Sequence, residues 1–400
     1  MIKNKVVIIG LGVIGLNLLL EINKVKKFKT YGFDISLKRI QEINIKYPKL
    51  KINNNSKTIK NAEFIIIAIK TQGQIKSICS ILLKQLEKGQ KIIIESTLRV
   101  GTCENVIKKI LEKSGLKAGI DFDIAHCPER LNPGDKKWTI KNIPRNLASS
   151  SRKANKEIKA FYKNFIDAEI HELSSLKVCE ASKLIENSFR DLNIAFVNEL
   201  SKIFDDANIN LKETILASAN KPFGFIPHFA GCGVGGRCIP EIPKFHPEKN
   251  IVPKILTTAR KINNSMPKYT IKIMLKALKE IKKDIKDIKI GILGLSYKEN
   301  FADKRGSVSL KIISELKELN ANFQTFDPYL LKDSSVKSLN HLLNFSDILL
   351  ITTAHDEFKK IKVNDLEKQK IKIIIDGRNC LDQKKFINTN IIYKGIGNSN

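Results

Sequence analysis

Residues 5–15 read KVVIIGLGVIG, and this stretch decides the fold class of the chain. Its β-branched start predicts a buried strand over Lys5–Gly10, and a helix is expected over Leu16–Val25. Three glycines stand between them in GxGxxG spacing: Gly10, Gly12 and Gly15. The first permits a tight turn, the second lets backbone approach a pyrophosphate, and the third lets the helix pack on the strand. Because the helix N-terminus then faces the phosphates, the stretch predicts a dinucleotide-binding turn.

Asp34 narrows the choice of dinucleotide. It stands near the end of a second expected strand, KTYGFDI, at residues 29–35. A carboxylate in this place binds both ribose hydroxyls and repels a 2′-phosphate, which favours NAD over NADP. The alternative is a plain glycine turn with an incidental acid, and the strand–turn–helix context argues against it.

The rest of the chain divides by its secondary-structure signals. Strands are expected at 62–69 and 90–97, each followed by a helix, and this alternation predicts a parallel, doubly wound sheet. From Leu176 helical periodicity takes over, and a second helical run spans 251–289, which Pro267 kinks or divides. Strand signals then return at 288–295, 323–329, 346–353 and 371–379. The predicted domains are 1–172 (α/β), 173–287 (helical) and 288–400 (α/β).

Composition limits the class of function. No run of about 18 or more apolar residues occurs, so no membrane span is expected, and the N-terminus leads into the glycine motif rather than a cleavage site. Seven cysteines without a CxxC pair suit a reducing cytoplasm. The net charge of +29 raises the hypothesis of nucleic-acid binding, but the lysines are spread along the whole chain and are not interleaved with aromatics. A solvated lysine-rich surface that attracts anionic substrates is the favoured interpretation.

Two segments at the ends of expected strands carry polar side chains. In ESTLRVGT (95–102), Thr97 lies where ligands of open parallel sheets bind, so it either faces the nicotinamide or caps a helix. In HCPERLNPGD (126–135), Glu129 and Arg130 form either an exposed pair or part of a cleft. His126 and Cys127 are adjacent, which is not the spacing of metal ligands, and no metal site is predicted.

The helical stretch EASKLIENSFRDLN (180–193) has two distinct faces. Lys183, Asn187 and Arg190 fall at i, i+4 and i+7 on one face. The opposite face carries an apolar stripe made of Ile185, Phe189, Leu192 and Phe196. The polar face is either solvated, or it lines a cleft where Lys183 and Asn187 supply charge and hydrogen bonds to an oxygen.

Cys238 stands in the glycine-rich stretch GCGVGGRCIPEIPKF (231–245). Gly233, Gly235 and Gly236 leave room for a carbonyl group, and Arg237 or Lys183 can supply the positive charge that favours a thiolate. A cysteine nucleophile on a dinucleotide-binding fold suggests oxidation at the aldehyde level, through a thiohemiacetal and then a thioester. A buried, inert thiol is the alternative.

Together these motifs resemble the nucleotide-sugar 6-dehydrogenases, the group of UDP-glucose, GDP-mannose and UDP-N-acetylhexosamine dehydrogenases. The likeness covers nearly all of the chain and rests on segments in the family's order: GLGVIGL, EST, CPERLNPG, EASKLIENSFRDLNIAFVNEL, GVGGRCIP, GLSYKENFADKRGS, FDPY and IDGRN. PERLNPGD and KLIENSFRDLNIAFVNEL look most like the branch that acts on UDP-N-acetylmannosamine, -glucosamine or -galactosamine. The implied fold is α/β, with two Rossmann-like doubly wound domains joined by a central helical dimerisation domain.

The resemblance implies a role for each matched residue. NAD would be held through Gly10, Gly12, Val13, Ile14, Gly15, Asp34, Thr71 and Thr97, with Arg305 reaching the cofactor or phosphates. The implied catalytic set is Cys238 as nucleophile, Lys183 and Asn187 for oxyanions and protons, Glu129 for thioester hydrolysis or sugar binding, and Thr97. The sugar nucleotide would contact Arg130, Leu131, Lys183, Asn187, Arg190, Gly235, Tyr297, Lys298 and Arg378.

The segment around Cys238 departs from the family pattern. The family usually reads GGHCIPVDP, with an aspartate four residues after the cysteine, where this chain has Ile242. Glu241 stands one position earlier, and Arg237 replaces the usual histidine. The missing aspartate bears on activation of the hydrolytic water, and whether Glu241 replaces it stays open.

The sequence thus predicts a cytoplasmic, homodimeric enzyme. It would use NAD to oxidise the C6 hydroxyl of a UDP-N-acetylhexosamine to the uronic acid, for surface polysaccharide biosynthesis. UDP-glucose or GDP-mannose as substrate is the near alternative, and oxidation that stops at the aldehyde or thioester is another. A non-catalytic NAD- and nucleotide-binding protein is the alternative of a different class. The sugar epimer and any assembly beyond a dimer stay open.

Overall fold

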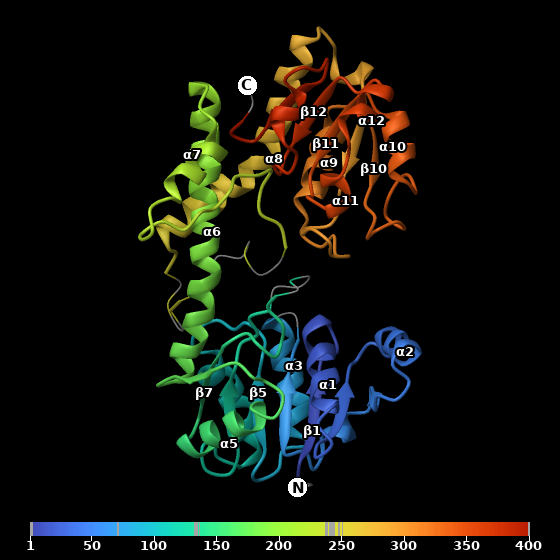
Figure 1. The fold of residues 1–400 in the computed structure, drawn as a ribbon. Coiled ribbons are helices and arrows are strands. Elements are labelled where there is room, and N and C mark those ends of the chain that lie inside the picture. Colours follow the sequence, from blue (N-terminus) through green and yellow to red (C-terminus); the bar gives the residue numbers. More distant parts are fainter. Residues whose placement is uncertain are drawn as a thin grey trace. The chain divides into compact units, whose positions relative to one another are not determined.

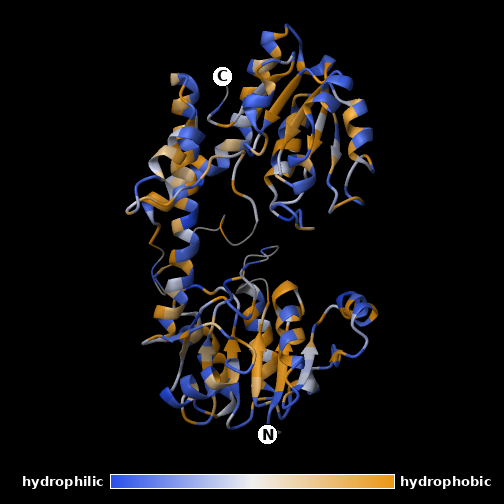
Figure 2. Ribbon diagram, in the orientation of Figure 1, coloured by the Kyte–Doolittle hydropathy of each residue, from blue (hydrophilic) through white to orange (hydrophobic). Residues whose placement is uncertain are grey.

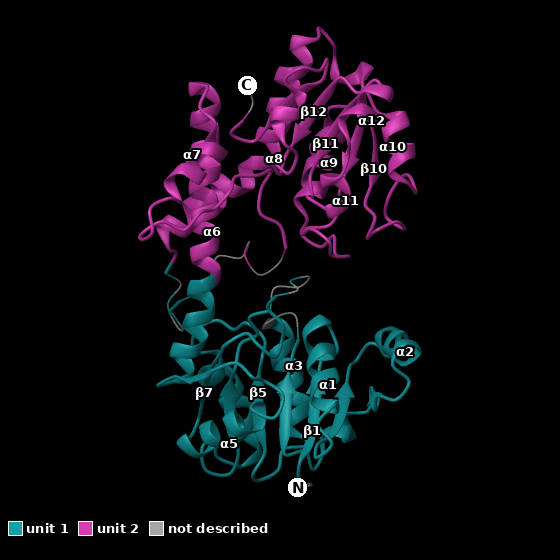
Figure 3. Cartoon of the chain, viewed as in Figure 1, with its two compact units in different colours: residues 1–186, 243–251 teal, residues 187–242, 252–400 magenta. Residues whose placement is uncertain are grey.

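Figure 1 shows the computed structural model of the chain, which describes residues 3–69, 72–131, 135, 137–236, 239, 245, 246, 249 and 251–398. The chain forms two compact units, residues 1–186 with 243–251, and residues 187–242 with 252–400 (Figure 3). The boundary falls inside one long helix, α6 (Leu176–Ala207). Each unit has its own sheet and its own hydrophobic core. The finer division into three domains stays a prediction.

The first unit is built on an eight-stranded sheet with the order β3-β2-β1-β4-β5-β6-β7-β8. Its strands are β1 (Lys5–Ile9), β2 (Lys29–Phe33), β3 (Ile52–Asn53), β4 (Phe64–Ile67), β5 (Lys91–Ile94), β6 (Asp123–His126), β7 (Arg145–Ser149) and β8 (Ile170–Glu172). Its helical segments are α1 (Val13–Asn23), α2 (Leu37–Lys46), η1 (Ser56–Ile59), α3 (Gln72–Leu83), η2 (Cys103–Lys108), α4 (Lys109–Leu111), η3 (Glu112–Ser114) and α5 (Arg152–Tyr162). The recorded pairings are parallel except between β6 and β7, so the expected doubly wound parallel sheet is confirmed with one antiparallel addition.

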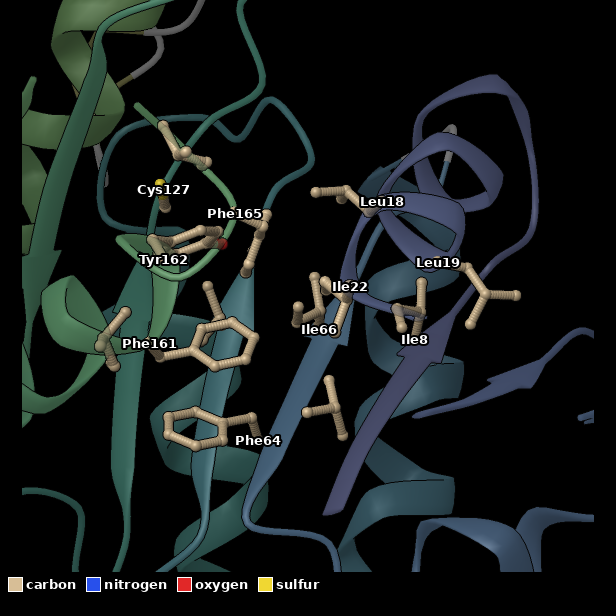
Figure 4. Packing of buried hydrophobic residues seen from close by; sticks show 14 of the residues in the cluster. Ile8, Leu18, Leu19, Ile22, Phe64, Ile66, Cys127, Phe161, Tyr162 and Phe165 are labelled. Atoms are coloured by element: carbon tan, nitrogen blue, oxygen red, sulfur yellow. The ribbon is translucent and has the colours of Figure 1, made fainter. Parts of the chain in front are cut away.

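Both faces of this first sheet are buried, which explains its continuous apolar strands. In β1, Val6 and Ile8 face a core that contains α1 and α5, where Leu18, Phe161 and Tyr162 pack (Figure 4). Val7 and Ile9 alternate to the other face, which packs against α3 and the segment at 103–111. Figure 2 shows the same arrangement, with hydrophobic strands inside each unit and polar residues on the outer sides of the helices.

The first helix starts earlier than the sequence suggests. The helix expected over Leu16–Val25 is α1, Val13–Asn23. Gly12 is its N-cap residue, and the Leu16 N–H donates to the Gly12 carbonyl at 3.0 Å, so the helix begins directly at the glycine turn. Apolar periodicity placed the start too late because Val13 and Ile14, in the first turn of the helix, are not buried in the core.

The second unit holds a five-stranded parallel sheet with the order β10-β9-β11-β12-β13. Its strands are β9 (Lys289–Leu293), β10 (Asn322–Phe326), β11 (Ile348–Ile351), β12 (Ile373–Asp376) and β13 (Ile392–Gly395). Its helical segments besides α6 are α7 (Leu211–Ser218), α8 (Lys254–Glu280), η4 (Ile285–Asp287), α9 (Val308–Glu318), α10 (Leu339–Phe345), α11 (Asp356–Lys359), α12 (Val363–Lys368) and η5 (Gln383–Phe386). The α/β class with two parallel-sheet domains and a long central helix is therefore confirmed.

Helix α8 corrects the expected second helical run. It ends at Glu280 rather than near residue 289, and it passes through Pro267 without being divided. A proline inside a helix removes one N–H donor. The side chain of Pro267 is buried, and tertiary packing of the apolar face of α8 offsets that local loss.

Candidate active site and nucleotide-binding turns

The glycine turn after β1 has the steric form that a pyrophosphate requires. Gly10 has a φ of +88°, and a Cβ atom there would lie 2.7 Å from the Ala68 carbonyl oxygen. A Cβ atom at Gly15 would overlap the Gly10 carbonyl, so α1 packs against the turn only because both residues are glycine. Val13 and Ile14 form the first turn of α1, whose backbone N–H groups have no partners within the helix. The turn therefore fits the diphosphate of a dinucleotide.

Asp34 is held beside that turn in an orientation suited to a ribose. Its Oδ2 accepts from the Leu11 N–H at 2.7 Å, and its Oδ1 accepts from the Ser36 N–H at 2.9 Å. The side chain is half-buried, so lone pairs of the carboxylate stay available to hydroxyl groups. Arg39 lies next to it, because its Nε donates to the Leu11 carbonyl at 2.8 Å. Arg39 was not among the predicted cofactor residues, although its position in the first turn of the helix after Asp34 follows from the sequence.

Thr97 lies exposed after β5, at the carboxyl edge of the sheet. No helix begins there, since the next helical segment starts at Cys103 with Thr102 as its N-cap residue. Ser96 fixes the segment, because its Oγ donates to the Ile69 carbonyl at 2.8 Å and accepts from the Ile69 N–H at 3.0 Å. The position of Thr97 suits a side chain that faces a bound ligand. Thr71 lies outside the described residues.

Helix α6 is tied to the segment that follows Thr97. The buried Glu180 carboxylate accepts from the Gly101 N–H at 2.5 Å and from the Cys103 N–H at 2.8 Å. Burial raises the pKa of Glu180, and hydrogen bonds from the Cys103 and Gly101 N–H groups oppose that rise. Because Lys183 stands one helical turn after Glu180, this contact fixes the Lys183 backbone relative to the Thr97 segment.

Lys183 and Arg130 share one carboxylate on the same side of the first unit. Arg130 Nη2 lies 2.7 Å from Glu186 Oε1, and Lys183 Nζ lies 3.6 Å from Glu186 Oε2. Arg130 also donates to the Pro144 carbonyl at 3.1 Å. All three side chains are half-buried, which is not the fully solvated face that the periodicity also allowed. Asn187 (half-buried) and Arg190 (exposed) follow on α6 in the second unit.

Glu129 is more enclosed than its predicted role suggests. The side chain is buried, and its Oε1 accepts from the N–H groups of Arg130 and Leu131 at 2.6 and 2.5 Å. Its Oε2 lies 3.4 Å from Nη2 of Arg145, a fully buried residue that the sequence analysis missed. No local pattern marks Arg145, because its partners are far away in the sequence.

In the second unit, the glycines before Cys238 are packed against the sheet edge. The Cys232 N–H donates to the Gly377 carbonyl at 2.8 Å, and the Gly236 N–H donates to the Gly306 carbonyl at 3.0 Å. A Cβ atom at Gly235 would lie 3.0 Å from the Gly306 carbonyl oxygen, so this approach requires glycine. Cys238, Arg237, Glu241 and Ile242 lie outside the described residues.

The helices hold the same glycine segment from another direction. The Gly231 N–H donates to Asn198 Oδ1 at 3.0 Å, and Asn198 Nδ2 donates to Asn263 Oδ1 at 2.8 Å. Asn263 in turn donates to Asp191 Oδ1 at 2.8 Å, and Asp191 pairs with Arg260. A buried polar network from α6 and α8 therefore reaches the segment that precedes Cys238.

Two of the predicted substrate residues of the second unit, Arg378 and Tyr297, lie against these glycines. Arg378 donates from Nε to the Thr352 carbonyl at 2.8 Å and from Nη1 to the Gly233 carbonyl at 3.2 Å. The Tyr297 ring lies close to Gly236, since a Cβ atom there would be 3.1 Å from it. Lys298 is half-buried beside Tyr297, and the exposed Arg305 donates from Nε to Asp303 Oδ1 at 2.7 Å.

The turn after β9 repeats the contacts of the first turn. Gly294 has a φ of +101°, and its N–H donates to the Phe326 carbonyl at 2.8 Å, as Gly10 donates to Phe33 at 2.9 Å. Asp327 follows β10 as Asp34 follows β2, and its Oδ2 accepts from the Leu295 N–H at 2.7 Å. Each unit therefore contains a nucleotide-binding type of turn at the carboxyl end of its first strand.

Within the described ranges, no group of three or more His, Cys, Asp or Glu side chains is placed to hold a metal ion. Among the same residues, no helix is both long and apolar enough to cross a membrane.

The fold and the first turn define an NAD-binding α/β dehydrogenase with a second nucleotide-binding sheet. Comparison with known families agrees. The chain matches three domains of the UDP-glucose/GDP-mannose dehydrogenase family: the NAD binding domain over residues 45–166, the central domain over 177–265 and the UDP binding domain over 291–383.

Individual relatives match along nearly the whole chain. The protein CapL of Staphylococcus aureus is 32% identical, over 97% of both chains. The UDP-N-acetyl-D-mannosamine dehydrogenase of Methanocaldococcus jannaschii is 32% identical, over 96% of this chain and 94% of that protein. The solved structure of UDP-D-ManNAc dehydrogenase from Pyrococcus horikoshii superposes with a TM-score of 0.90 at 28% identity, covering 99% of each chain. The chain belongs to the UDP-glucose/GDP-mannose dehydrogenase family, and it is a nucleotide-sugar dehydrogenase that uses NAD.

Proposed function

We propose that the chain oxidises the C6 hydroxyl of a UDP-N-acetylhexosamine to the carboxylate, with two NAD consumed for each sugar. One structural observation carries the assignment of the site. Glu180 and the Arg130–Glu186 pair gather Thr97, the segment at 129–131 and Lys183 on one side of the first unit, which also carries the NAD turn. The choice of sugar is supported by relatives named UDP-N-acetyl-D-mannosamine dehydrogenase and UDP-N-acetyl-D-glucosamine 6-dehydrogenase.

The chemistry is assigned to the residues of this chain as follows. Gly10, Gly12, Val13, Ile14, Gly15 and Asp34 hold NAD, with Thr71, Thr97 and Arg305 as further contacts, and the bound cofactor supplies the hydride acceptor for both oxidations. Lys183, with Asn187 beside it, either stabilises negative charge on the reacting oxygen as an ammonium group or, in its neutral form, accepts the hydroxyl proton. The Cys238 thiolate bonds to C6 of the aldehyde and carries the acyl group as a thioester. Water then cleaves the C6–S bond, which releases the carboxylate and restores the thiol.

The family resemblance supports the assignment of the sugar-nucleotide contacts, which is made for each unit by itself. Arg130 and Leu131 contact it from the first unit, together with Lys183. The second unit contributes Asn187, Arg190, Gly235, Tyr297, Lys298 and Arg378. Five of these nine residues are arginine or lysine, and their positive charge suits a diphosphate and the carboxylate that the reaction forms.

The decisive experiment counts NADH released per sugar nucleotide over a panel of UDP-hexoses and UDP-N-acetylhexosamines. About two NADH for each UDP-N-acetylhexosamine, abolished in Cys238→Ala, is the expected result. Turnover of UDP-glucose or GDP-mannose alone would contradict the assigned sugar. NAD binding without NADH production on any sugar would favour a non-catalytic nucleotide-binding protein.

Ile242 supports a second outcome of the same experiment. It stands where the family usually has the aspartate four residues after the cysteine. Loss of that carboxylate would slow activation of the hydrolytic water more than any other step. A stoichiometric burst of NADH that then stalls would show a thioester that is formed but not hydrolysed. Ile242→Asp is expected to restore steady turnover in that case. If Glu241 activates the water instead, the wild-type enzyme should not stall and Ile242→Asp should have little effect.

Homodimerisation through α6 is proposed on the basis of an exposed apolar stripe. Val178, Ile185, Phe189, Phe196 and Ile203 lie along this helix and are between 44% and 59% exposed. Their spacings of seven and four residues keep them on one face, as in helices that pair with a second helix. Phe196→Glu is expected to give a monomer in light scattering, while Phe196→Leu keeps the dimer.

A cytoplasmic location and a role in surface polysaccharide biosynthesis belong to the proposed enzymatic function.

A further inference from the structure

A buried charge cluster lies beneath the edge of the first sheet. Its members are Glu95 at 1%, Arg145 at 0%, Glu129 at 6% and Tyr162 at 0% exposure. Glu95 directly follows β5, Glu129 follows β6, and Arg145 begins β7. Because β5 and β6 are parallel neighbours, both carboxylates stand at the carboxyl edge where ligands of such sheets bind.

Arg145 joins the two strand ends. Its Nη1 lies 2.9 and 2.7 Å from the two oxygens of Glu95, and its Nη2 lies 3.4 Å from Glu129 Oε2. Tyr162 Oη donates to Glu95 from the helix side at 2.5 Å. The backbone adds one further link, because the Glu129 N–H donates to the Glu95 carbonyl at 3.0 Å.

Each carboxylate leads directly to a segment of the proposed active site. Glu95 stands two residues before Thr97. The Glu129 side chain bonds to the next two residues, because its Oε1 accepts from the N–H groups of Arg130 and Leu131. Every oxygen of the Glu129 carboxylate is therefore engaged inside the protein, which leaves shaping of the segment at 129–131 as the role that the contacts support.

A cluster of this kind is poorly explained by stability alone. Burial of an ion pair costs desolvation energy, and a well-packed apolar group of similar volume is often equally stable. Two carboxylates share one guanidinium here, so the cluster also carries an unbalanced negative charge if both are ionised. Burial raises the pKa of Glu95, and the neighbouring Arg145 opposes that rise. What the cluster gains is geometric, because a guanidinium fork fixes two carboxylates at defined angles.

We infer that Arg145 is a positioning residue of the dehydrogenase reaction. Through Glu95 it holds the Thr97 segment, and through Glu129 it holds the Glu129–Leu131 segment, so the two segments keep a fixed position relative to each other. This inference rests on the proposed function for its catalytic consequence. The geometric part, that Arg145 orders the segment at 129–131, stands independently of the substrate.

Arg145→Lys is the test, because lysine keeps the charge but cannot bridge two carboxylates with a fork. We expect kcat on the UDP-N-acetylhexosamine to fall about 10- to 100-fold, since small misplacement of reacting groups has effects of that size. The Kd for NADH should rise much less, by no more than about fivefold, because the glycine turn and Asp34 lie apart from the cluster along the sheet and only the Thr97 contact is displaced. Equal losses in kcat and in NADH affinity would overturn the inference.

Tyr162→Phe provides the matched control. It removes one hydrogen bond to the same Glu95 carboxylate but leaves the link between the two segments intact. A lower Tm with nearly unchanged kcat is expected for this variant. If Tyr162→Phe and Arg145→Lys lower kcat equally at equal loss of Tm, Arg145 acts only through stability and the inference is wrong.

A double-mutant cycle with Glu129→Gln tests the route of the effect. If Arg145 acts through Glu129, the double variant should be no slower than the slower single variant. Multiplicative losses would mean that the two residues act independently, which contradicts the proposed route. Should Arg145→Lys fail to fold, Glu95→Gln, which keeps the side-chain volume, replaces it in the same cycle.

Tryptic cleavage after Arg130 separates this inference from the proposed function. The bond should be cut at least several-fold faster in Arg145→Lys than in Tyr162→Phe, because the 129–131 segment loses its anchor. An inactive wild-type enzyme with this cleavage pattern would overturn the proposed function and leave the ordering role in place. An active wild-type enzyme with equal cleavage in both variants would support the proposed function and overturn the ordering role of Arg145.

Discussion

The turn after β1 and the turn after β9 are built from the same contacts, yet their acids face different surroundings. In both, a left-handed glycine donates to the carbonyl of a phenylalanine, and the next N–H donates to an aspartate at 2.7 Å. Asp34 is half-buried and has spare lone pairs, whereas Asp327 is fully buried. The helix follows at once in the first turn, but α9 begins only at Val308, twelve residues after Ser296.

The difference shows how one turn can serve two purposes. In the first unit the helix N-terminus and an accessible acid are offered to a dinucleotide. In the second unit Asp327 accepts from the Ser296 N–H at 2.8 Å and from His355 Nε2 at 3.1 Å, so the acid is used inside the fold. The long segment from Tyr297 to Ser307 then replaces the helix and brings lysine and arginine side chains to the edge.

The largest effect is expected for Asp327→Asn. The two Asp327 carboxylate oxygens accept from backbone N–H groups of Leu295, Ser296 and Tyr329. Asparagine would replace one of these oxygens with an N–H₂ group, which leaves buried donors without an acceptor, so the free energy of unfolding should fall by about 3 kcal/mol. Urea unfolding measures this, and NADH binding should be nearly unchanged. If stability stays at the wild-type value, Asp327 is not the internal anchor that the comparison requires.

The pKa of Asp327 gives this prediction a pH dependence. Burial opposes ionisation, but hydrogen bonds from His355 and from the Leu295 N–H outweigh it and hold the pKa below its ordinary value. The stabilisation is therefore complete above the unfolded-state pKa of about 4 and is lost as the pH falls below it. In Asp327→Asn this acid-dependent loss should be absent.

Asp34→Asn should show the opposite balance. The amide oxygen can still accept from Leu11, so the free energy of unfolding should change by less than about 1 kcal/mol. NADH affinity should fall about 10- to 100-fold, because the charged partner of the ribose hydroxyls is lost. Fluorescence titration measures the loss, and the preference for NAD over NADP should narrow as repulsion of the 2′-phosphate disappears. A variant that unfolds as readily as Asp327→Asn would remove the distinction between the two acids.

The sequence predicted the first of these turns well and the second poorly. Gly10, Gly12, Gly15 and Asp34 stand in a spacing that has a physical reason at each position, and in the structure the glycines form the turn after β1 with Asp34 beside it. The second turn reads Gly294-Leu295-Ser296, without the two later glycines, because no helix packs directly on it. A repeated pattern could have indicated the second turn: GL at 10–11 is followed by GFD at 32–34, and GL at 294–295 is followed by TFD at 325–327.

The candidate site was predictable only where chemistry is local. Lys183 and Arg130 were selected as candidates from a helix face and a strand end, but Glu186, with which both pair, was not named. Arg145 and Glu95 are 50 residues apart, so nothing in the local pattern indicates that they pair. Buried tertiary networks of this kind depend on strand order, which a single sequence does not provide.

The histidines near the two sheet edges offer a second comparison. His355 has both ring nitrogens engaged, since Nδ1 accepts from the Asn300 N–H at 2.8 Å. His126 faces the Ser96 carbonyl through Nε2 at 3.1 Å, while its Nδ1 has no hydrogen-bond partner among the described residues. Burial, with the charge of Lys183, lowers the pKa of His126 to about 4.

His126 should therefore make the first unit sensitive to mild acid. The unfolded chain binds a proton on this residue below about pH 6.5 while the folded chain does not, so stability is lost as the pH falls from that value toward 4. By pH 5 the loss should approach about 2 kcal/mol. Urea unfolding at pH 7 and pH 5 measures it, with His126→Gln as the comparison that should lack this part of the slope. Parallel slopes in the two proteins would contradict the assignment.

The smallest effects are expected at the serine beside each acid. Ser296 is buried and its Oγ donates to Asp327 Oδ2 at 2.8 Å, so Ser296→Ala should lower the free energy of unfolding by about 1.5 kcal/mol. Ser36 is exposed and caps α2 by accepting from the Arg39 N–H at 3.3 Å, so Ser36→Ala should cost about 0.5 kcal/mol. Neither substitution removes the backbone N–H that holds its acid. Paired urea titrations resolve the difference, and a larger loss at Ser36 would show that the first acid, not the second, is the one built into the fold.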